Sequence, residues 1–335
     1  MFVFWKFLES AARYCERRAK FATDPTEEML QEVHFYTDET FIFRDDAGRF
    51  SFYIPGDQHM WGKATGGHQR WGIVHGIFDY YLTLNEDEVE AEPEPPRKQR
   101  KKNVEIPPNP KGYRRTFETY IETFKCWSCS SDGNMDTEKF LEWLESVLQF
   151  FQGQDGFGEN DILVVHLDNA SYHKTSNPEF FDVDAKNVKP QQIAVWILEN
   201  APAEYGYDDI STLHDENGKL LPVDQLKWIV KNHCHNHPKK ILDLVKSYDK
   251  RYRVEFTPPY WPHVAPPELM WNNLKLDYRR WDSKDKIRNV AASVRTFMNA
   301  VTEKDCEGYV RKTDQFCIKI ANRDEELLKE LELSL

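Results

Sequence analysis

Runs of apolar residues along the chain predict strands in its first half. Aromatic and β-branched residues, which favour strands, dominate residues 32–43, 49–56, 70–84 and 113–127. The run ILVVHL at 162–167 is apolar without interruption, which is typical of a strand buried on both faces. The segment VEFTPPYWP at 254–262 begins with one more short strand. Because Gly-rich turns separate the first strands, we expect them to form a three-strand meander.

Helical periodicity dominates the two ends of the chain and much of its middle. Residues 1–32 and 135–151 carry apolar side chains at helical spacing. Most of 182–250 is predicted to be helical, a helix is expected to begin at Pro267, and the tail from 283 predicts two or three more helices. Strands followed by helices, and then by one strand that is buried on both faces, predict a mixed α/β fold.

Composition narrows the class of protein. A chain of 335 residues can bury a large core, and six cysteines in such a length do not form a disulfide framework. No run of eighteen apolar residues occurs, and the first twenty residues contain acids and arginines where a signal peptide would have an apolar core. We therefore expect a soluble, intracellular protein with reduced thiols and no membrane partner.

Charge is distributed unevenly along the chain. The net charge of −12 excludes a protein whose whole surface binds nucleic acid, so any contact with DNA must be local. Basic clusters occur at 97–102, at 239–253 and around Lys275; each is also explained by ordinary solvated surface, and the first by a localisation signal. Residues 86–112 combine an acidic block, a basic block and several prolines, which predicts a charged, disordered insertion.

Three acidic residues occupy positions in or beside predicted buried elements, where a carboxylate is unfavourable without a compensating partner. Asp38 lies in the middle of the first predicted strand, Asp168 directly follows the buried strand, and Glu268 lies in the first turn of a predicted helix. Burying carboxylates is unfavourable unless they are paired or bind cations. Three convergent carboxylates suit Mg²⁺ or Mn²⁺, which prefer oxygen ligands. Two such ions about 3.5–4 Å apart would support in-line displacement at a phosphodiester.

The segment before Glu268 is unusually stiff. In TPPYWPHVAPPE five prolines fix φ and disfavour helical structure in the residues before them. Pro267 suits the first turn of a helix, where the charge of Glu268 is favourable. We expect Trp271, one turn later, to anchor this helix in the core.

Four segments together resemble the mariner-type DDE transposases of the RNase H-like, retroviral-integrase superfamily. They are VHFYTDETFIF, RWGIVHGIFD, LVVHLDNASYH and VEFTPPYWPHVAPPELMWNNLK, and they occur in the family's order. The resemblance implies an RNase H-like fold with a mixed five-stranded sheet flanked by helices. It also implies that Asp38, Asp168 and Glu268 are catalytic and bind two Mg²⁺ or Mn²⁺ ions, with Asn169 and His173 lining the site.

The resemblance also implies partners and an activity. The activity is metal-dependent DNA cleavage and strand transfer, the partners are transposon ends and target DNA, and a homodimer is left open. The location is nuclear in a eukaryote and otherwise cytoplasmic. For phosphate contacts the candidate residues are basic side chains near the last acid or in the helical segment before it: Lys239, Lys240, Arg251, Arg253 and Lys275.

The sequence departs from the family's pattern in three places. Asp168 and Glu268 are 100 positions apart, where the family usually has a few dozen, so about 182–245 is expected to be a helical insertion within a catalytic domain at 33–282. His263 and Ala265 stand where the family usually has Asp and Asn. Residues 1–32 are too few for the family's two helix-turn-helix modules, so we expect a linker remnant there and a helical tail at 283–335.

Other functions are compatible with parts of the sequence. Cys126 and Cys129 together with HCHNH at 233–237, which includes Cys234, have residue types suited to zinc, although Cys126 and Cys129 lie in one predicted strand whose alternation places the two thiols on opposite faces. Tyr260 and Trp261 could stack on an unpaired base or belong to the core. A catalytically inactive DNA-binding or scaffolding protein on the same fold is the main alternative, and a nuclease acting on RNA hybrids is a third.

Overall fold

The computed structural model describes residues 2–43, 69–85, 108–259, 261–280 and 289–334. The chain divides into two compact units. The first consists of Met1–Asn169 together with Val254–Leu335, and the second is Ala170–Arg253. The second unit therefore interrupts the first between two segments that carry predicted acids.

A mixed six-stranded sheet is the frame of the first unit. Its strands are β1 (Glu32–Phe43), β2 (Arg70–Thr83), β3 (Tyr113–Glu118), β4 (Lys125–Ser128), β5 (Ile162–Leu167) and β6 (Arg253–Phe256). The order is β3-β2-β1-β5-β6, and β4 also pairs with β2. β1 is antiparallel to β2 and parallel to β5, and β2 is antiparallel to β3 and β4. The predicted mixed α/β sheet is confirmed, and its described meander is β1-β2-β3.

The number of strands differs from the predicted five because residues 113–127 do not form one strand. β3 pairs with Phe78–Thr83 and β4 with Trp71–Val74, so both lie along β2. Between these two stretches the ring of His75 bonds to the hydroxyls of Thr119 and Thr123. These side-chain bonds draw the chain into a short 3₁₀ turn, η2 (Ile121–Thr123), and divide the predicted strand in two.

Several predictions concern residues that the structure does not describe. They are the strand at 49–56, the portion 86–107 of the charged insertion with its basic run at 97–102, the start of the tail up to 288, and the stacking candidate Tyr260. These expectations stay predictions.

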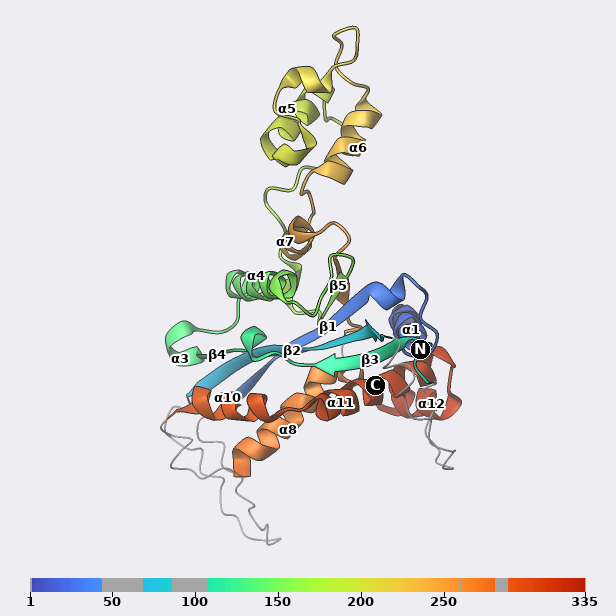
Figure 1. The fold of residues 1–335 in the computed structure, drawn as a ribbon, viewed down its shortest axis with the longest axis vertical. Coiled ribbons are helices and arrows are strands. Elements are labelled where there is room, and N and C mark those ends of the chain that lie inside the picture. Colours follow the sequence, from blue (N-terminus) through green and yellow to red (C-terminus); the bar gives the residue numbers. More distant parts are fainter. Residues whose placement is uncertain (1, 44–68, 86–107, 260, 281–288, 335) are drawn as a thin grey trace. The chain divides into compact units, whose positions relative to one another are not determined.

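Helices cover both faces of the sheet. Figure 1 shows α4 (Thr137–Gly153) on one face and α8 (Pro266–Arg280), α10 (Val290–Ala300) and α11 (Glu303–Ala321) on the other. The other helices among the described residues of this unit are α1 (Phe2–Thr23), α3 (Cys129–Asp132) and α12 (Glu325–Ser334). The helices expected at 135–151 and in the tail are thus confirmed. Over the described residues, no helix has the length and apolar character needed to cross a bilayer.

The second unit is helical, as its sequence predicts. Its helices are α5 (Pro190–Asn200), α6 (Val223–His233) and α7 (Lys240–Tyr248). The first two helices build a core of their own around Ile193, Ile197, Leu226 and Val230, all fully buried or nearly so. A separate apolar core explains why this unit is compact by itself.

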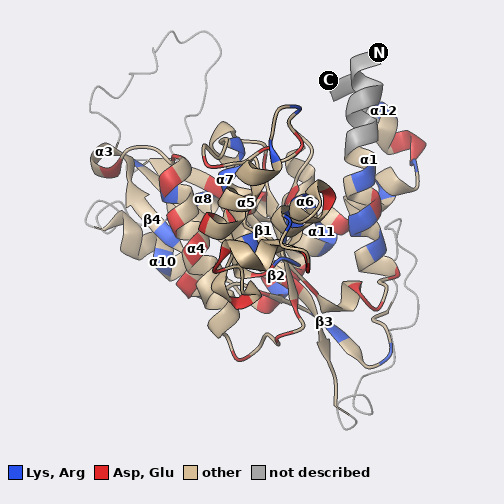
Figure 2. Cartoon of the chain, turned by 90° about the horizontal axis from the view of Figure 1, so that it is seen from above, with Lys and Arg blue, Asp and Glu red and all other residues tan. Residues whose placement is uncertain are grey.

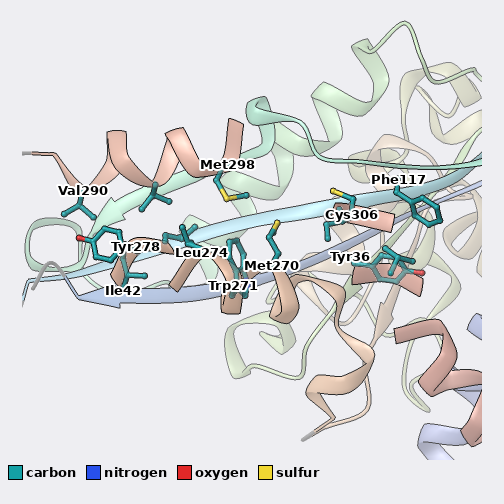
Figure 3. Close-up of a cluster of buried hydrophobic side chains, with 14 residues drawn as sticks. Tyr36, Ile42, Phe117, Met270, Trp271, Leu274, Tyr278, Val290, Met298 and Cys306 are labelled. Atoms are coloured by element: carbon teal, nitrogen blue, oxygen red, sulfur yellow. The ribbon is translucent and has the colours of Figure 1, made fainter. Parts of the chain in front are cut away.

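The apolar side of α8 packs against the sheet next to the predicted acids. Met270, Trp271 and Leu274 are fully buried and share one cluster with Tyr36 and Ile42 of β1 (Figure 3). Trp271 is therefore the anchor that the sequence predicts. Since helix positions one turn apart share a face, this packing fixes the rotation of α8 about its axis.

A chain of buried charges ties α1 and α11 to the sheet. Arg115 of β3 binds Asp79 of β2 with two hydrogen bonds of 2.7 Å, and its Nη1 lies 2.8 Å from Asp314 of α11. Asp314 in turn accepts a hydrogen bond of 2.9 Å from Arg18 of α1. All four side chains are at most 4% exposed, so each charge depends on its neighbours for compensation.

Close contact between β1 and β2 predicts that Gly76 cannot be replaced. A Cβ at Gly76 would lie 2.7 Å from the backbone oxygen of Tyr36 and would also collide with the ring of Phe35. We expect Gly76→Ala to lower the free energy of unfolding by about 1–3 kcal/mol, the usual effect of overpacking. Chemical denaturation measures this change. Gly308→Ala, in α11 where a Cβ meets nothing within 4 Å, is the control and should be neutral or stabilising; equal losses in both variants would contradict the packing explanation.

Candidate active site

Two of the predicted acids lie on neighbouring parallel strands, Asp38 within β1 and Asp168 directly after the end of β5. The register of β1 and β5 pairs Tyr36 with His166, so Asp38 and Asp168, each two residues further, continue it on the same face. Adjacent strands are about 4.8 Å apart, so Asp38 and Asp168 are neighbours across these two strands. Asp38 is partly buried and Asp168 is exposed, so the pair is open to solvent on one side.

The third acid comes from the start of α8. Glu268 is in the first turn of this helix and partly buried, and its amide donates to the carbonyl of Ala265 at 3.1 Å. Before it, a 3₁₀ turn, η6 (Pro262–Val264), is closed by the hydrogen bond from the Val264 amide to the Trp261 carbonyl at 3.2 Å. This stiff segment and the buried Trp271 fix both the start and the rotation of α8, and so the position of Glu268.

The three acids interact electrostatically. The pKa of Asp38 is raised well above its usual range, first by burial and then by the negative charges of Glu39, Glu268 and Asp168. Residues 130 and 230 positions further along the chain thus act on one carboxyl group. Like charges in one place oppose ionisation of a member, and an added cation would relieve this repulsion.

The residue opposite Asp38 supplies no positive charge. His75 pairs with Asp38 in the β1–β2 register and is buried, and burial lowers its pKa to about 4. Its Nδ1 lies 3.1 Å from the hydroxyl of Thr123, which holds the ring in place. The imidazole beside Asp38 is therefore uncharged at neutral pH and does not offset the negative charges that act on Asp38.

The donor set fits a hard divalent cation. Three carboxylates with an open side match the oxygen ligands and the remaining water positions that Mg²⁺ and Mn²⁺ prefer. In the part of the chain that the structure describes, no three His, Cys, Asp or Glu side chains are already close enough together to hold a metal ion.

The two predicted site-lining residues lie in different units. Asn169, in the first unit, donates its side-chain amide to the carbonyl of Thr257, and the amide of Thr257 donates to Leu167 at 2.7 Å. Asn169 therefore fixes the end of β5 and the adjacent Asp168. His173 is buried in the second unit, in the turn η3 (Ser171–Lys174), with its ring 4.4 Å from that of Tyr172.

Most of the predicted phosphate contacts also belong to the second unit. Lys239 and Lys240 are at the start of α7, Arg251 is paired with Asp249 at 2.7 Å, and Arg253 is the last residue of the unit. Lys275 is on α8 in the first unit, two turns after Glu268 and on the same side of the helix. The structure thus places only Lys275 on an element that carries an acid.

The residues of the alternative zinc site are divided between the units, and burial opposes ionisation of two of its thiols. Burial raises the pKa of Cys126 in the first unit to about 12, and burial raises the pKa of Cys234 in the second unit to about 11. Zinc binds thiolates, so raised pKa values oppose this use. All six cysteines are free. Trp261 is 5% exposed and packs edge-on to Phe316 of α11, which favours its core role.

Two residues that act on the site are not among those predicted from the sequence. Glu39 makes the largest charge contribution to the raised pKa of Asp38. The sequence feature that could have identified it is its position directly after Asp38. Arg18 is 2% exposed and donates to the carbonyl of Val264 at 2.6 Å, just before α8. Its signal was its spacing, because it continues the buried stripe of α1 formed by Ala11, Cys15 and Ala22.

The raised pKa of Asp38 predicts that this acid destabilises the metal-free fold. The folded protein holds this proton more tightly than the unfolded chain, so the stability it contributes is present at low pH and is lost as pH rises through the folded pKa. We expect Asp38→Asn to have a higher Tm than the native chain at pH 8 in EDTA. The difference should shrink towards pH 4, near the ordinary pKa of aspartate of about 3.9.

Thermal unfolding over this pH range measures the effect. Asp136→Asn is the matched control, because Asp136 caps α4 and its pKa is lowered by hydrogen bonds from Lys139. This variant should gain no stability at pH 8. If the native chain at pH 8 has a Tm equal to or above that of Asp38→Asn, ionised Asp38 does not destabilise the fold.

Comparisons with known proteins add no relative to this picture. No protein-family model matches the chain, and no curated protein matches it. What is known of the site therefore comes from its own geometry: three acids from β1, the end of β5 and the start of α8 acting on one another.

Proposed function

We propose that this protein is a DDE transposase-like enzyme on an RNase H-like fold, which cleaves DNA phosphodiesters and transfers strands with two Mg²⁺ or Mn²⁺ ions. One observation carries the proposal: Glu268 and Asp168 raise the pKa of Asp38, although the three acids are far apart in the sequence. The antiparallel meander with β5 added parallel to β1 supports the fold assignment.

Each acid would have a defined task. Asp38 within β1 and Asp168 after β5 would hold cations, and Glu268 would complete the ligand set from α8. When bound, the two ions supply charge stabilisation for the attacking and leaving oxygens. In the first step a water oxygen bonds to phosphorus while the bond to the 3′ oxygen breaks, which leaves a 3′-hydroxyl. In the second step that hydroxyl attacks phosphorus in another strand and displaces its 3′ oxygen.

The side of α8 that carries Glu268 supports a path for the DNA backbone. Asn272, Lys275 and Arg279 follow Glu268 at intervals of four, three and four residues, which places all of them on one stripe. Lys275 is partly exposed and Arg279 exposed. Elsewhere basic and acidic positions are mixed on the described helices (Figure 2), so a local stripe is what a chain of net charge −12 can offer to phosphate.

Cleavage of supercoiled plasmid DNA tests the proposal. We expect nicking that requires Mg²⁺ or Mn²⁺, and a loss of at least about 100-fold in Asp168→Asn and Glu268→Gln, equivalent to about 2.7 kcal/mol of transition-state stabilisation. Asp277→Asn is the control, because Asp277 is an acid of the same helix on the side opposite Glu268. It should cleave as the native chain does.

The other outcomes identify the alternatives. Metal-independent background nicking that is equal in the native chain and Asp168→Asn, with DNA binding retained, would overturn the enzyme assignment and identify a DNA-binding protein on the same fold. Cleavage of RNA–DNA hybrids in preference to duplex DNA would identify the nuclease alternative.

The basic stripe makes a second prediction. Lys275→Ala should weaken binding of duplex DNA and reduce the slope of log K against log salt by about 0.9, the amount expected for one phosphate contact. Filter binding at several salt concentrations, with EDTA present to prevent cleavage, measures the slope. Arg280→Ala is the control, because Arg280 lies about a third of a turn away from the stripe and 3.6 Å from Asp277. If both variants shift equally, the stripe is not the contact surface.

A further inference from the structure

Helix α1 makes three contacts to residues that precede the three acids in the sequence by two to four positions. The Tyr14 hydroxyl and Nδ1 of His166 are hydrogen-bonded at 3.0 Å, and His166 is two residues before Asp168 on the same side of its strand. Arg18 lies over the ring of Tyr36, two residues before Asp38, at 4.3 Å. The same Arg18 donates through Nη1 to the carbonyl of Val264, four residues before Glu268, at 2.6 Å. Helix α1 therefore contacts a residue close in sequence to each of the three acids.

We propose that Arg18 is a positioning residue that fixes Glu268 relative to Asp38. Its guanidinium group joins the ring of Tyr36 to the carbonyl of Val264, and both lie within four residues of an acid. The assignment of Glu268 and Asp38 as metal ligands rests on the proposed function, but the positioning of η6 and α8 by Arg18 does not.

The geometry leaves Arg18 little freedom to move. Besides Val264, it donates through Nε to Asp314 at 2.9 Å and through Nη2 to the hydroxyl of Thr313, so all three nitrogens are engaged. The side chain is 2% exposed. A planar fork held at three points transmits position better than a flexible ammonium group, which has no fixed geometry.

The turn that Arg18 contacts is packed from the same two helices. Val264 is fully buried and Trp261 nearly so, in one cluster with Cys15 of α1 and Cys317 of α11. The Val264 carbonyl points to Arg18, while the next carbonyl, that of Ala265, accepts the amide of Glu268. A shift of the first carbonyl therefore passes to Glu268 through one peptide unit.

Arg115 offers a matched control. It belongs to the same buried charge chain and also binds Asp314, at 2.8 Å, but its other partner is Asp79. Arg115→Lys and Arg18→Lys both keep a buried positive charge and lose the fork. A merely structural role for Arg18 would make the two variants equivalent at the candidate site.

Two measurements on the full chain test the proposal. Binding of Mn²⁺ without DNA can be measured from the electron paramagnetic resonance signal of the free ion. The affinity should fall about tenfold in Arg18→Lys and less than twofold in Arg115→Lys. Hydrogen exchange of residues 262–270, corrected for the global stability of each variant, should be at least about fivefold faster in Arg18→Lys than in Arg115→Lys. Equal changes in the two variants would overturn the proposal.

The exchange measurement separates this inference from the proposed function. If the native chain binds no Mn²⁺, the metal-dependent function fails, and exchange at 262–270 alone then supports or overturns positioning by Arg18. If the native chain binds Mn²⁺ and Arg18→Lys binds it equally well, the function stands and the positioning role is wrong. If Arg18→Lys does not fold, Thr313→Val replaces it in both measurements, because it removes one of the three partners of the Arg18 guanidinium group. Mn²⁺ binding should again weaken and exchange at 262–270 should again be faster than in Arg115→Lys, both by smaller factors.

Discussion

The buried chain of charges from Asp79 through Arg115 and Asp314 to Arg18 is the constraint on which the first unit depends. Removing one member of such a chain leaves an uncompensated buried charge, at an expected loss of about 3–5 kcal/mol. The chain joins β2, β3, α11 and α1, elements from both ends of the sequence. Because Arg18 also reaches the Val264 carbonyl, the same network that holds the helices on the sheet determines where α8 begins.

Stability and chemistry oppose each other at the acids. The charge chain places each of its buried charges beside an opposite one, whereas Glu39, Glu268 and Asp168 raise the pKa of Asp38, and its cross-strand partner His75 is uncharged. On the proposed function, bound cations would relieve this repulsion. The network of paired buried charges supplies rigidity to the elements that carry the acids.

Sequence patterns predict the local elements well and the long-range polar contacts poorly. The aromatic and β-branched residues of β1 and the uninterrupted apolar run of β5 are local properties of the sequence, and they suffice to place Asp38 within a strand and Asp168 at the end of one. The division of residues 113–127 depends on Thr119 and Thr123 meeting His75, more than forty positions earlier. The burial of Arg18 depends on partners 246 and 296 positions away, which no local period reveals.

The long separation of Asp168 from Glu268 is compatible with a fixed site because the insertion is closed at its base. The amide of Thr257 bonds to Leu167, and the side chain of Asn169 bonds back to the carbonyl of Thr257. These bonds join Leu167 and Asn169, which precede Ala170–Arg253, to Thr257, which follows it. The two ends of the insertion are therefore held together within the first unit, independently of the length of the insertion. The entropy of closing a loop grows only slowly with its length, by about 0.6 kcal/mol per doubling. A helical unit with its own core therefore adds little strain at Asp168, and the position of Glu268 is set from the other direction, by η6 and Arg18.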